Sequence, residues 1–351
     1  MARSVSVIIV TWNALEHLQT FLPSVAATEY DNLEVLIADN ASTDGSAEWV
    51  RENFPTFNVV TLMRNFGYCG GNNRAADHAN GEILLFLNND VRVEPGWLEP
   101  IIREFEDPNV AAVQPKILSH TEPGHFEYAG AAGGYLDRMG YPFCRGRIFD
   151  HVERDTGQYD DRRPIFWASG AALAIRKTCF MEAGRFDDTF EFHMEEIDLC
   201  WRLWNRGQKV IYTPESRVFH LGGGSLPSGS SRKAYFNFRN NLQMLWKNAT
   251  TEWLKSRFFF RLLLDGVAAF HALATGHAGV FGAIFRAHMR FYTRWPALNR
   301  QRKALQAERK MSFNPETMLD LNILAEHFLH GKKKFSEVVE EGEQLTEEKH
   351  G

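Results

Sequence analysis

The sequence is poor in cysteine, and its cysteines lie far apart. Only four occur among 351 residues, and none form a CxxC pair. This pattern excludes a disulfide framework and a cysteine-bound zinc cluster, and it fits a reducing compartment. We therefore expect a cytoplasmic protein. The four are Cys69, Cys144, Cys179 and Cys200.

Long apolar runs and nucleotide-binding glycine motifs are also missing. No stretch of about twenty uninterrupted apolar residues occurs, so we expect no membrane-spanning helix. The apolar run at residues 5–10 is too short for a signal peptide. Neither GxGxxG nor GxxxxGKS/T is present, which counts against a dinucleotide-dependent dehydrogenase and a P-loop NTPase.

An excess of positive charge is absent as well. The formal net charge of -5 at pH 7 argues against a general nucleic-acid binder, so we expect no nucleic-acid partner. The composition, with 44% hydrophobic and 24% charged residues, is ordinary for a soluble globular protein. The length suits two to three domains or one elaborated domain.

Apolar runs alternate with helical patterns in the first part of the chain. The runs at 5–10, 33–38, 59–62 and 83–87 are typical of buried parallel strands. Their alternation with helices predicts an α/β fold with a mostly parallel central sheet. Ligands of such sheets collect at the carboxyl ends of the strands, so we expect the site there.

The regular alternation ends after a further strand at 110–113. Residues 119–165 are rich in Gly, Pro and Tyr and predict a long, partly ordered excursion. A strand over 165–176 and a helix over 235–248 are expected to follow. The last twenty residues are lysine-rich and then glutamate-rich, which predicts a solvated tail.

Polar or glycine-rich turns follow the first strands. Asp39 ends the second strand, where its carboxylate can accept a hydrogen bond from a base N–H or a ribose hydroxyl. Ser42 and Asp44 offer further oxygens at a helix start, although simple helix capping explains them equally well. The glycine-rich turn from Asn65 to Asn73 precedes a helix, a place suited to a diphosphate or a sugar.

Asp90 follows the fourth strand in the sequence LLFLNND. Mg²⁺ and Mn²⁺ are held by one or two carboxylates together with substrate phosphates, and imidazole is acceptable to Mn²⁺. We expect Asp90 and His220 to hold such a metal, because His220 ends a strand just before the glycine-rich run Gly222–Ser225. The alternative for His220 is a satisfied structural histidine.

Three carboxylates within four residues stand at the head of a predicted helix: Glu195, Glu196 and Asp198. In a pocket shared with His220, one of them could take a proton. The alternative is that they only occupy the first turn of the helix, where the macrodipole favours acids.

Trp167 lies in a stretch of small residues that includes Gly170 and Ala171. A tryptophan at the edge of such a strand can stack on a sugar ring. Burial in the core is the commoner fate of a large aromatic side chain, and both interpretations stay open.

These stretches, taken in order, resemble the family 2 glycosyltransferases of GT-A fold, and they look most like the bacterial branch that includes rhamnosyl- and galactofuranosyl-transferases. The resemblance covers roughly residues 3–250 and depends on the ordered combination rather than on any single motif. The motifs are VSVIIVTWN, NASTDGS, NFGYCGGNN, LLFLNND, FWASGAALAIR, HMEEIDLCWRLW and HLGGGS.

The resemblance implies a Rossmann-like sheet flanked by helices and an inverting transfer of a sugar from a nucleotide-diphosphate sugar to a hydroxyl. Asp39 matches the base-contacting aspartate and Asp90 the last acid of the metal-binding DxD motif. Glu196 matches the general base, and His220 resembles a metal-binding histidine. Trp167, Gly170 and Ala171 would lie near the acceptor. The residues expected to bind the donor are Thr11, Asn13, Asp39, Ser42, Asp44, Asn65, Gly67, Asn72, Asn89 and Asp90.

The sequence departs from the family pattern at two places. Asn88 stands where DxD has its first acid, which leaves Asp90 as the only carboxylate. The usual Glu-Asp reads Glu195-Glu196, so the base carries an extra methylene. Glu195 and Asp198 therefore stay candidates for the catalytic carboxylate beside Glu196.

Donor and acceptor follow from the resemblance only in outline. We expect dTDP-rhamnose or a UDP-sugar as donor and a glycan or polyprenyl-linked acceptor, in cell-surface polysaccharide synthesis. One alternative is a non-catalytic scaffold that binds nucleotide sugars or glycans. A sugar nucleotidyltransferase is disfavoured, because residues 11–14 read TWNA and lack a glycine-rich phosphate loop with a basic residue.

Residues 253–307 are unusually basic, with nine Lys or Arg and one acid, Asp265. Arg286, Arg290 and Arg294 are spaced four apart, and aromatic residues lie between them. A basic, aromatic, amphipathic helix is typical of an interfacial anchor on anionic lipid. We therefore expect a protein peripheral to the inner face of the plasma membrane. The alternative is a pair of helices that pack on the catalytic domain.

These observations divide the chain into four stretches. Residues 1–115 are expected to form the nucleotide-sugar-binding half of the GT-A domain, and 116–230 the acceptor-binding and catalytic half. Residues 231–310 would form a helical, membrane-associating extension, and 311–351 a helical, charged tail with a disordered end.

Overall fold

The computed structural model describes residues 2–222, 229–311 and 317–339. Two stretches for which the sequence makes a prediction lie outside these residues. One is the run Gly223–Ser225 of the glycine-rich loop, and the other is the end of the charged tail, from residue 340 onward.

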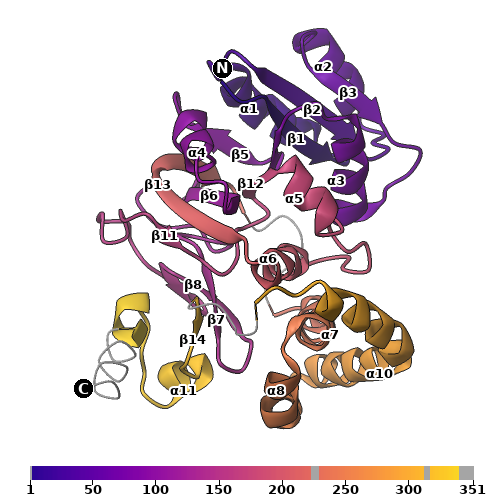
Figure 1. Ribbon diagram of the computed structural model, residues 1–351, viewed down its shortest axis with the longest axis vertical. Coiled ribbons are helices and arrows are strands. Elements are labelled where there is room, and N and C mark those ends of the chain that lie inside the picture. Colours follow the sequence, from indigo (N-terminus) through magenta and orange to yellow (C-terminus); the bar gives the residue numbers. More distant parts are fainter. Residues whose placement is uncertain (1, 223–228, 312–316, 340–351) are drawn as a thin grey trace.

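A nine-stranded sheet forms the centre of the molecule, in the order β11-β13-β6-β12-β4-β1-β2-β3, with β5 paired to β13 (Figure 1). Six strands run in one direction, and β5, β11 and β12 run against them. The expected mostly parallel α/β sheet is confirmed. The strands are β1 (Val5–Thr11), β2 (Leu33–Asp39), β3 (Asn58–Thr61), β4 (Ile83–Leu87), β5 (Val91–Val93), β6 (Val110–Ser119), β11 (Arg163–Pro164), β12 (Ala172–Arg176) and β13 (Lys209–His220).

Alternate residues of the strands enter two separate cores, because successive side chains point to opposite faces of a sheet. Val7 and Ile9 of β1 pack on one side with Leu18 of the first helix, whereas Ile8 packs on the other side with Ala75. Helices therefore cover both faces (Figure 1). They are α1 (Leu15–Ala26), α2 (Ser46–Asn53), α3 (Gly67–His78), α4 (Leu98–Glu104), α5 (Lys177–Glu182) and α6 (Glu195–Asn205).

The expected boundary between the two halves, at residues 115 and 116, lies inside β6. That strand pairs with β12 and β13, so both halves contribute to one continuous sheet.

A second sheet of five strands replaces most of the expected excursion over 119–165, in the order β10-β9-β8-β7-β14. The expectation was wrong because glycines that look irregular in the sequence form tight turns here: Gly140 and Gly146 have φ of 77° and 98° and join short antiparallel strands. The strand expected over 165–176 is limited to β12. The second sheet contains β7 (Gly134–Asp137), β8 (Pro142–Cys144), β9 (Arg147–Ile148), β10 (His151–Val152) and β14 (Met318–Leu319).

Helices follow β13, and the longest, α10, packs along α7 below α6 (Figure 1). None of the helices in the described part of the chain is long and apolar enough to cross a bilayer. The elements are α7 (Ser231–Asn248), α8 (Thr251–Trp253), the π-helical turn η1 (Leu254–Phe258), α9 (Phe259–Ala274), α10 (Ala278–Ala307) and α11 (Ile323–Phe328).

The start of the expected solvated tail is folded. Phe335 and Val338 are buried, and the ring of Phe335 lies 5.0 Å from that of Tyr135 in the second sheet. The expectation was wrong for residues 332–339, because these two apolar side chains within the charged run reach the hydrophobic core.

Gly134 on β7 offers a direct test of this packing. A Cβ atom there would lie 2.0 Å from Cε2 of Trp167. We expect Gly134→Ala to lower the free energy of unfolding by about 1–3 kcal/mol or more through overpacking, measured by denaturant unfolding. Gly266→Ala on α9 is the control, since its Cβ would meet no atom within 4 Å. An unchanged midpoint for Gly134→Ala would contradict the packing described.

Candidate functional site

The ends of β1, β2 and β4 meet at one edge of the sheet. Thr11 and Asp39 are partners in the register of β1 and β2, and Nδ2 of Asn89, just after β4, donates to Oγ1 of Thr11 at 3.2 Å. Asp39 is buried, and its Oδ1 accepts from the N–H of Ser42 at 3.1 Å. The sequence was therefore right to expect these polar residues close together.

Hydrogen bonds join the loop after β1 to the loop after β2. Asn13, in a left-handed conformation with φ 48°, donates its N–H to Ser42 Oγ, and its Oδ1 accepts from the N–H of Thr43. Asp44 accepts from the N–H of Leu15 at 2.9 Å. Burial raises the pKa of Asp44, but hydrogen bonds, chiefly from Ser46, outweigh it and hold the pKa below its usual value. Ser42 and Asp44 thus fix the shape of this edge.

Most of the expected glycine-rich turn belongs to α3. The helix begins at Gly67, which has a φ of 71° and donates its N–H to Asn65. Gly71 and Asn72 therefore lie inside the helix. A Cβ at Gly71 would lie 2.8 Å from Cγ1 of Val10. The glycine is needed because α3 approaches β1 closely, and Asn72 donates to the carbonyl of Tyr68. The expectation of a turn was wrong here.

Asn40 is a residue of this edge that sequence reasoning missed. Its Oδ1 accepts from the N–H of Phe66 at 2.9 Å, and its Nδ2 donates to the carbonyl of Gly67 at 3.1 Å. It therefore ties the end of β2 to the start of α3. Its place directly after Asp39 was the one available signal.

Asp90 and His220 form a buried pair beside the same edge. His220 Nε2 lies 3.1 Å from Asp90 Oδ1, and Nδ1 lies 3.4 Å from Oε1 of Glu127. Burial lowers the pKa of His220, but Asp90 and Glu127 outweigh it and raise the pKa to about 10. The amide of Asn88 lies 3.3 Å from the same Nε2. No motif or spacing in the sequence pointed to Glu127.

This pair offers donor types that suit a divalent cation. A carboxylate oxygen and an imidazole nitrogen are both acceptable to Mn²⁺, and Asp90 Oδ1 and His220 Nε2 lie 3.1 Å apart, so both could hold one cation. A metal would replace the proton that the pair shares, so binding would compete with protonation. Among the described residues no three His, Cys, Asp or Glu side chains are arranged to hold a metal, so other donors would have to complete the shell.

Glu195 and Glu196 begin α6 after a strained turn. His193 and Met194 both have positive φ, of 65° and 74°, which is rare for such side chains. One carboxylate oxygen of each glutamate is buried without a hydrogen-bond partner in the protein. Burial raises the pKa of Glu196 to about 7, and burial together with the charge of Glu196 raises the pKa of Glu195 well above its usual value.

Burial therefore raises the pKa of both carboxyl groups. The pKa of Glu196, about 7, suits a general base that works near neutral pH.

Asp198 is enclosed in an ion-pair network. It is fully buried, and its oxygens lie 3.0 Å from Arg202 Nη2 and 3.0 Å from Lys247 Nζ, while Asn248 donates to it at 2.7 Å. These partners leave it no free oxygen to take a proton from a ligand. Its expected candidacy as a catalytic carboxylate is not supported by this geometry.

Trp167 is a core residue in this structure. It is 5% exposed, lies against Gly134 and donates its indole N–H to the carbonyl of Tyr135 at 3.2 Å. Of the two interpretations left open, burial in the core is the one that the geometry supports.

Gly170 and Ala171 are hydrogen-bonded to residues near the glutamates of α6 and near the Asp90–His220 pair. Tyr68, whose pKa is raised by burial and by the nearby Glu195, donates its hydroxyl to the carbonyl of Gly170 at 2.8 Å. The carbonyl of Ala171 accepts from the N–H of Asn88 at 3.0 Å. Hydrogen bonds thus run from Tyr68, which lies near Glu195, to Gly170, and from Ala171 to Asn88, which lies against His220.

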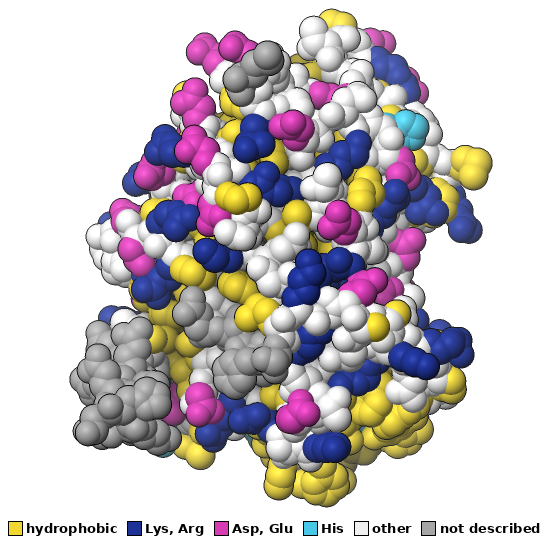
Figure 2. Space-filling view, viewed as in Figure 1, with side chains coloured by type: hydrophobic (Ala, Val, Ile, Leu, Met, Phe, Trp, Pro, Cys, Tyr) yellow, Lys and Arg dark blue, Asp and Glu magenta, His cyan; other side chains and the backbone are white. Residues whose placement is uncertain are grey.

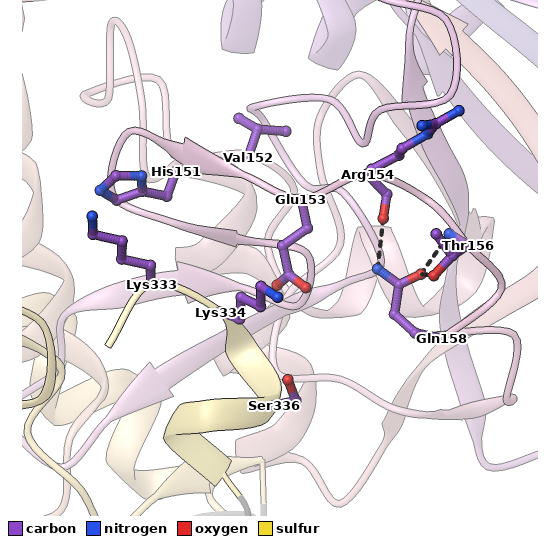
Figure 3. Close-up of a pocket in the computed structure, with 9 residues that line it drawn as sticks. All are labelled: His151, Val152, Glu153, Arg154, Thr156, Gln158, Lys333, Lys334 and Ser336. Carbon is purple, nitrogen blue, oxygen red and sulfur yellow. Dashed lines mark hydrogen bonds between the residues drawn. The ribbon is translucent and has the colours of Figure 1, made fainter. Parts of the chain in front are cut away.

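A separate surface pocket of about 550 Å³ lies between β10 and the carboxy-terminal segment (Figure 3). None of the expected site residues line it. Its lining residues are His151, Val152, Glu153, Arg154, Thr156, Gln158, Lys333, Lys334 and Ser336.

Comparison with known proteins gives a family and a fold. The model of the glycosyl transferase family 2 matches residues 6–157. This stretch is a family 2 glycosyltransferase domain. It contains Asp39 and Asp90, whereas Glu196 and His220 lie beyond the matched residues.

Two relatives of the domain are bacterial. The chain is 31% identical over 220 residues to an O-antigen biosynthesis protein of Myxococcus xanthus, covering 62% of this chain and 17% of that protein. It is 27% identical over 239 residues to an N-acetylglucosaminyl-diphospho-decaprenol L-rhamnosyltransferase of Mycobacterium tuberculosis, covering 63% and 76% of the two chains. The chain thus spans only a small part of the first relative.

A solved structure agrees on the fold. GalNAc-T7, crystallised with UDP, GalNAc and Mn²⁺, superimposes with a TM-score of 0.55 at 18% identity, covering 70% of this chain and 48% of that one. The expected GT-A fold with a helical carboxy-terminal region is confirmed.

Helix α7 carries residues near the two glutamates that sequence reasoning missed. Asn240 is fully buried, and its Nδ2 donates to the carbonyls of Phe192 and His193 at 2.7 and 2.9 Å. Arg239 donates in turn to Asn240 Oδ1 at 2.8 Å. Asn240 therefore holds the strained turn that precedes the two glutamates. The only sequence signal was a run of polar residues on an otherwise ordinary helix.

Loss of the Asn240 hydrogen bonds should lower the stability of the protein. Asn240→Ala removes the donor from two partly buried carbonyls, so we expect the free energy of unfolding to fall by about 1–3 kcal/mol, measured by denaturant titration. Asn53→Ala removes an amide that donates to a backbone carbonyl on an exposed helix surface, and it should change stability by less than about 0.5 kcal/mol. Equal effects of the two variants would contradict the role given to Asn240.

Proposed function

We propose that this chain transfers a sugar from a nucleotide-diphosphate sugar to a hydroxyl of an acceptor, with inversion at the anomeric carbon. The observation that carries the proposal is the pair of Glu195 and Glu196, each with a buried oxygen lacking a partner. Tyr68, whose pKa is raised by burial and by the charges of both glutamates, donates to Gly170, and Ala171 accepts from Asn88 at the edge of the sheet, where ligands of α/β folds bind.

Glu196 serves as the base in this proposal. Direct displacement at the anomeric carbon requires the acceptor hydroxyl to lose its proton, and a positioned base contributes about 10²–10⁴-fold. A pKa raised to about 7 by burial leaves Glu196 ionised enough to accept a proton and basic enough to hold it.

Asp39 and the Asp90–His220 pair act on the donor. Asp39, buried at the end of β2, accepts a hydrogen bond from the base N–H or a ribose hydroxyl. Asp90 and His220 would hold Mg²⁺ or Mn²⁺, with diphosphate oxygens and water completing the shell. The metal would supply charge compensation to the departing diphosphate. The Mn²⁺ and UDP named for GalNAc-T7 support this assignment.

The names of the relatives support a particular donor and acceptor for the proposed reaction. The mycobacterial enzyme is named as a rhamnosyltransferase acting on a decaprenyl-linked diphospho-sugar, which supports dTDP-rhamnose as donor and a polyprenyl-linked acceptor. A UDP-sugar is the second donor we consider. The Myxococcus relative supports a place in cell-surface polysaccharide synthesis. Such a reaction would occur at the cytoplasmic face of the membrane.

Replacing Glu196 tests the proposal. We expect Glu196→Gln to lower the transfer rate by about 10²–10⁴-fold, measured with radiolabelled donor and acceptor. Donor binding, measured by calorimetry, should be unchanged because the residue acts on the acceptor. Transfer that survives Glu196→Gln would overturn the assignment of the base, and a protein that binds donor but never transfers would favour a binding scaffold.

Glu195→Gln is the matched control. In this proposal Glu195 does not take the proton of the acceptor, and the amide has nearly the size of the carboxyl group, so transfer should be retained within a few-fold. In the wild type, transfer should rise with pH and level off above about 7, because Glu196 is ionised above its raised pKa. Loss of transfer in Glu195→Gln but not in Glu196→Gln would reverse the two roles.

A further inference from the structure

Helix α9 has the reverse of the usual polarity of a surface helix. Such helices normally bury an apolar stripe and expose their charges. In α9 the charged residues Arg261 and Asp265 are buried, at 2% and 0% exposure. Its exposed face is apolar, with side chains 45–67% exposed: Phe259, Phe260, Leu263, Val267, Phe270 and Leu273.

The buried polar face fixes this orientation. Arg261 forms an ion pair with Asp265, donates to Asn241 on α7 at 3.0 Å, and stacks on the ring of Tyr141 at 3.9 Å. His288 on α10 lies 3.1 Å from the other oxygen of Asp265. Rotating α9 to hide its phenylalanines would expose or unpair these charges, which is costly. The apolar face is therefore held outward.

Helix α10 extends this surface and adds positive charge. Phe285, Met289 and Tyr292 are exposed, and Arg286 and Arg290 are exposed beside them. The expected stripe of three arginines is wrong at Arg294, which donates to Gln243 of α7 at 3.0 Å and faces the protein. Hydrophobic side chains gather at the lower edge of the molecule, over the carboxy-terminal helices (Figure 2).

The outer surface of the α9–α10 hairpin carries no exposed acid. Asp265 is the only acidic residue between positions 253 and 307, and it is buried. An apolar surface flanked by arginines and free of carboxylates complements an anionic lipid surface, where aromatic side chains enter the interface and arginines meet headgroups. A protein partner would need acidic groups around an apolar centre, and nothing in the structure indicates one.

We propose that the outer face of α9, with Phe285, Met289 and Tyr292 of α10, docks in the interfacial layer of an anionic membrane. Helix α9 lies in the plane of the layer, since it is too short and not apolar enough to span it. The inference stands on the hairpin alone and goes beyond the proposed transfer reaction. Combined with that reaction, it brings the carboxylate turn held by α7 to the surface where a polyprenyl-linked acceptor would lie.

Vesicle sedimentation with the full chain tests this proposal. The probes are vesicles of phosphatidylcholine alone and of phosphatidylcholine with about one third phosphatidylglycerol. The wild type should bind the anionic vesicles, and binding should weaken with salt. The variant Phe260→Gln, Val267→Gln, Phe270→Gln should lose at least ten-fold in binding. Its side chains are exposed, so it should fold normally, as checked by its thermal midpoint.

Two further variants test whether vesicle binding depends on this apolar face and on its arginines. Met63→Gln with Leu329→Gln alters exposed apolar residues elsewhere and should bind as the wild type does. Arg286→Glu with Arg290→Glu should remove the preference for anionic vesicles. Wild-type protein that stays in the supernatant with anionic vesicles would overturn the proposal. So would a dimer that the triple variant dissociates without any vesicle binding, since a second copy would then cover the face. Neither result depends on transfer activity.

Discussion

The buried ammonium of Lys247 is the contact on which the site and the carboxy-terminal helices both depend. It lies 2.6 Å from Asp187 and 3.0 Å from Asp198, and so joins α7 to the loop before α6 and to α6 itself. Removing one partner of such a buried pair costs about 3–5 kcal/mol. Because α7 also supports α10 and the Arg261–Asp265 pair through Asn241, the same helix positions the two glutamates and holds the hairpin outward.

Much of the strand edge could be predicted from the sequence, because buried parallel strands are long β-branched runs and their polar ends stand out. Asp39 and Asp90 were placed at this edge in this way, whereas Glu196 was singled out by the carboxylate cluster at the head of its helix and by the resemblance. The second sheet could not be predicted, since its strands of two to four residues carry no periodicity and depend on turns at Gly140 and Gly146. The glycines of α3 were misinterpreted because their reason, the close approach to Val10, is a tertiary contact.

The roles of charged residues were harder to predict than their positions. Asp198 and Glu196 look alike in the sequence, yet one is enclosed by Arg202 and Lys247 and the other has an oxygen without a partner. Partners from distant segments decide between them. The same holds for α9, where only the fold shows that Arg261 and Asp265 face inward and the phenylalanines outward. An amphipathic pattern gives the two faces of a helix but not which of them is buried.

We infer that the edge formed by Asp39, Asp90 and His220 binds a pyrimidine nucleotide-diphosphate sugar together with a divalent metal. The most direct measurement is a thermal-shift panel of UDP-, dTDP- and GDP-sugars with and without Mn²⁺, on the wild type and on Asp90→Asn. We expect stabilisation by a UDP- or dTDP-sugar, larger with Mn²⁺, and loss of the Mn²⁺ effect in Asp90→Asn. An unchanged midpoint across the whole panel, or the same Mn²⁺ effect in Asp90→Asn, would contradict the account.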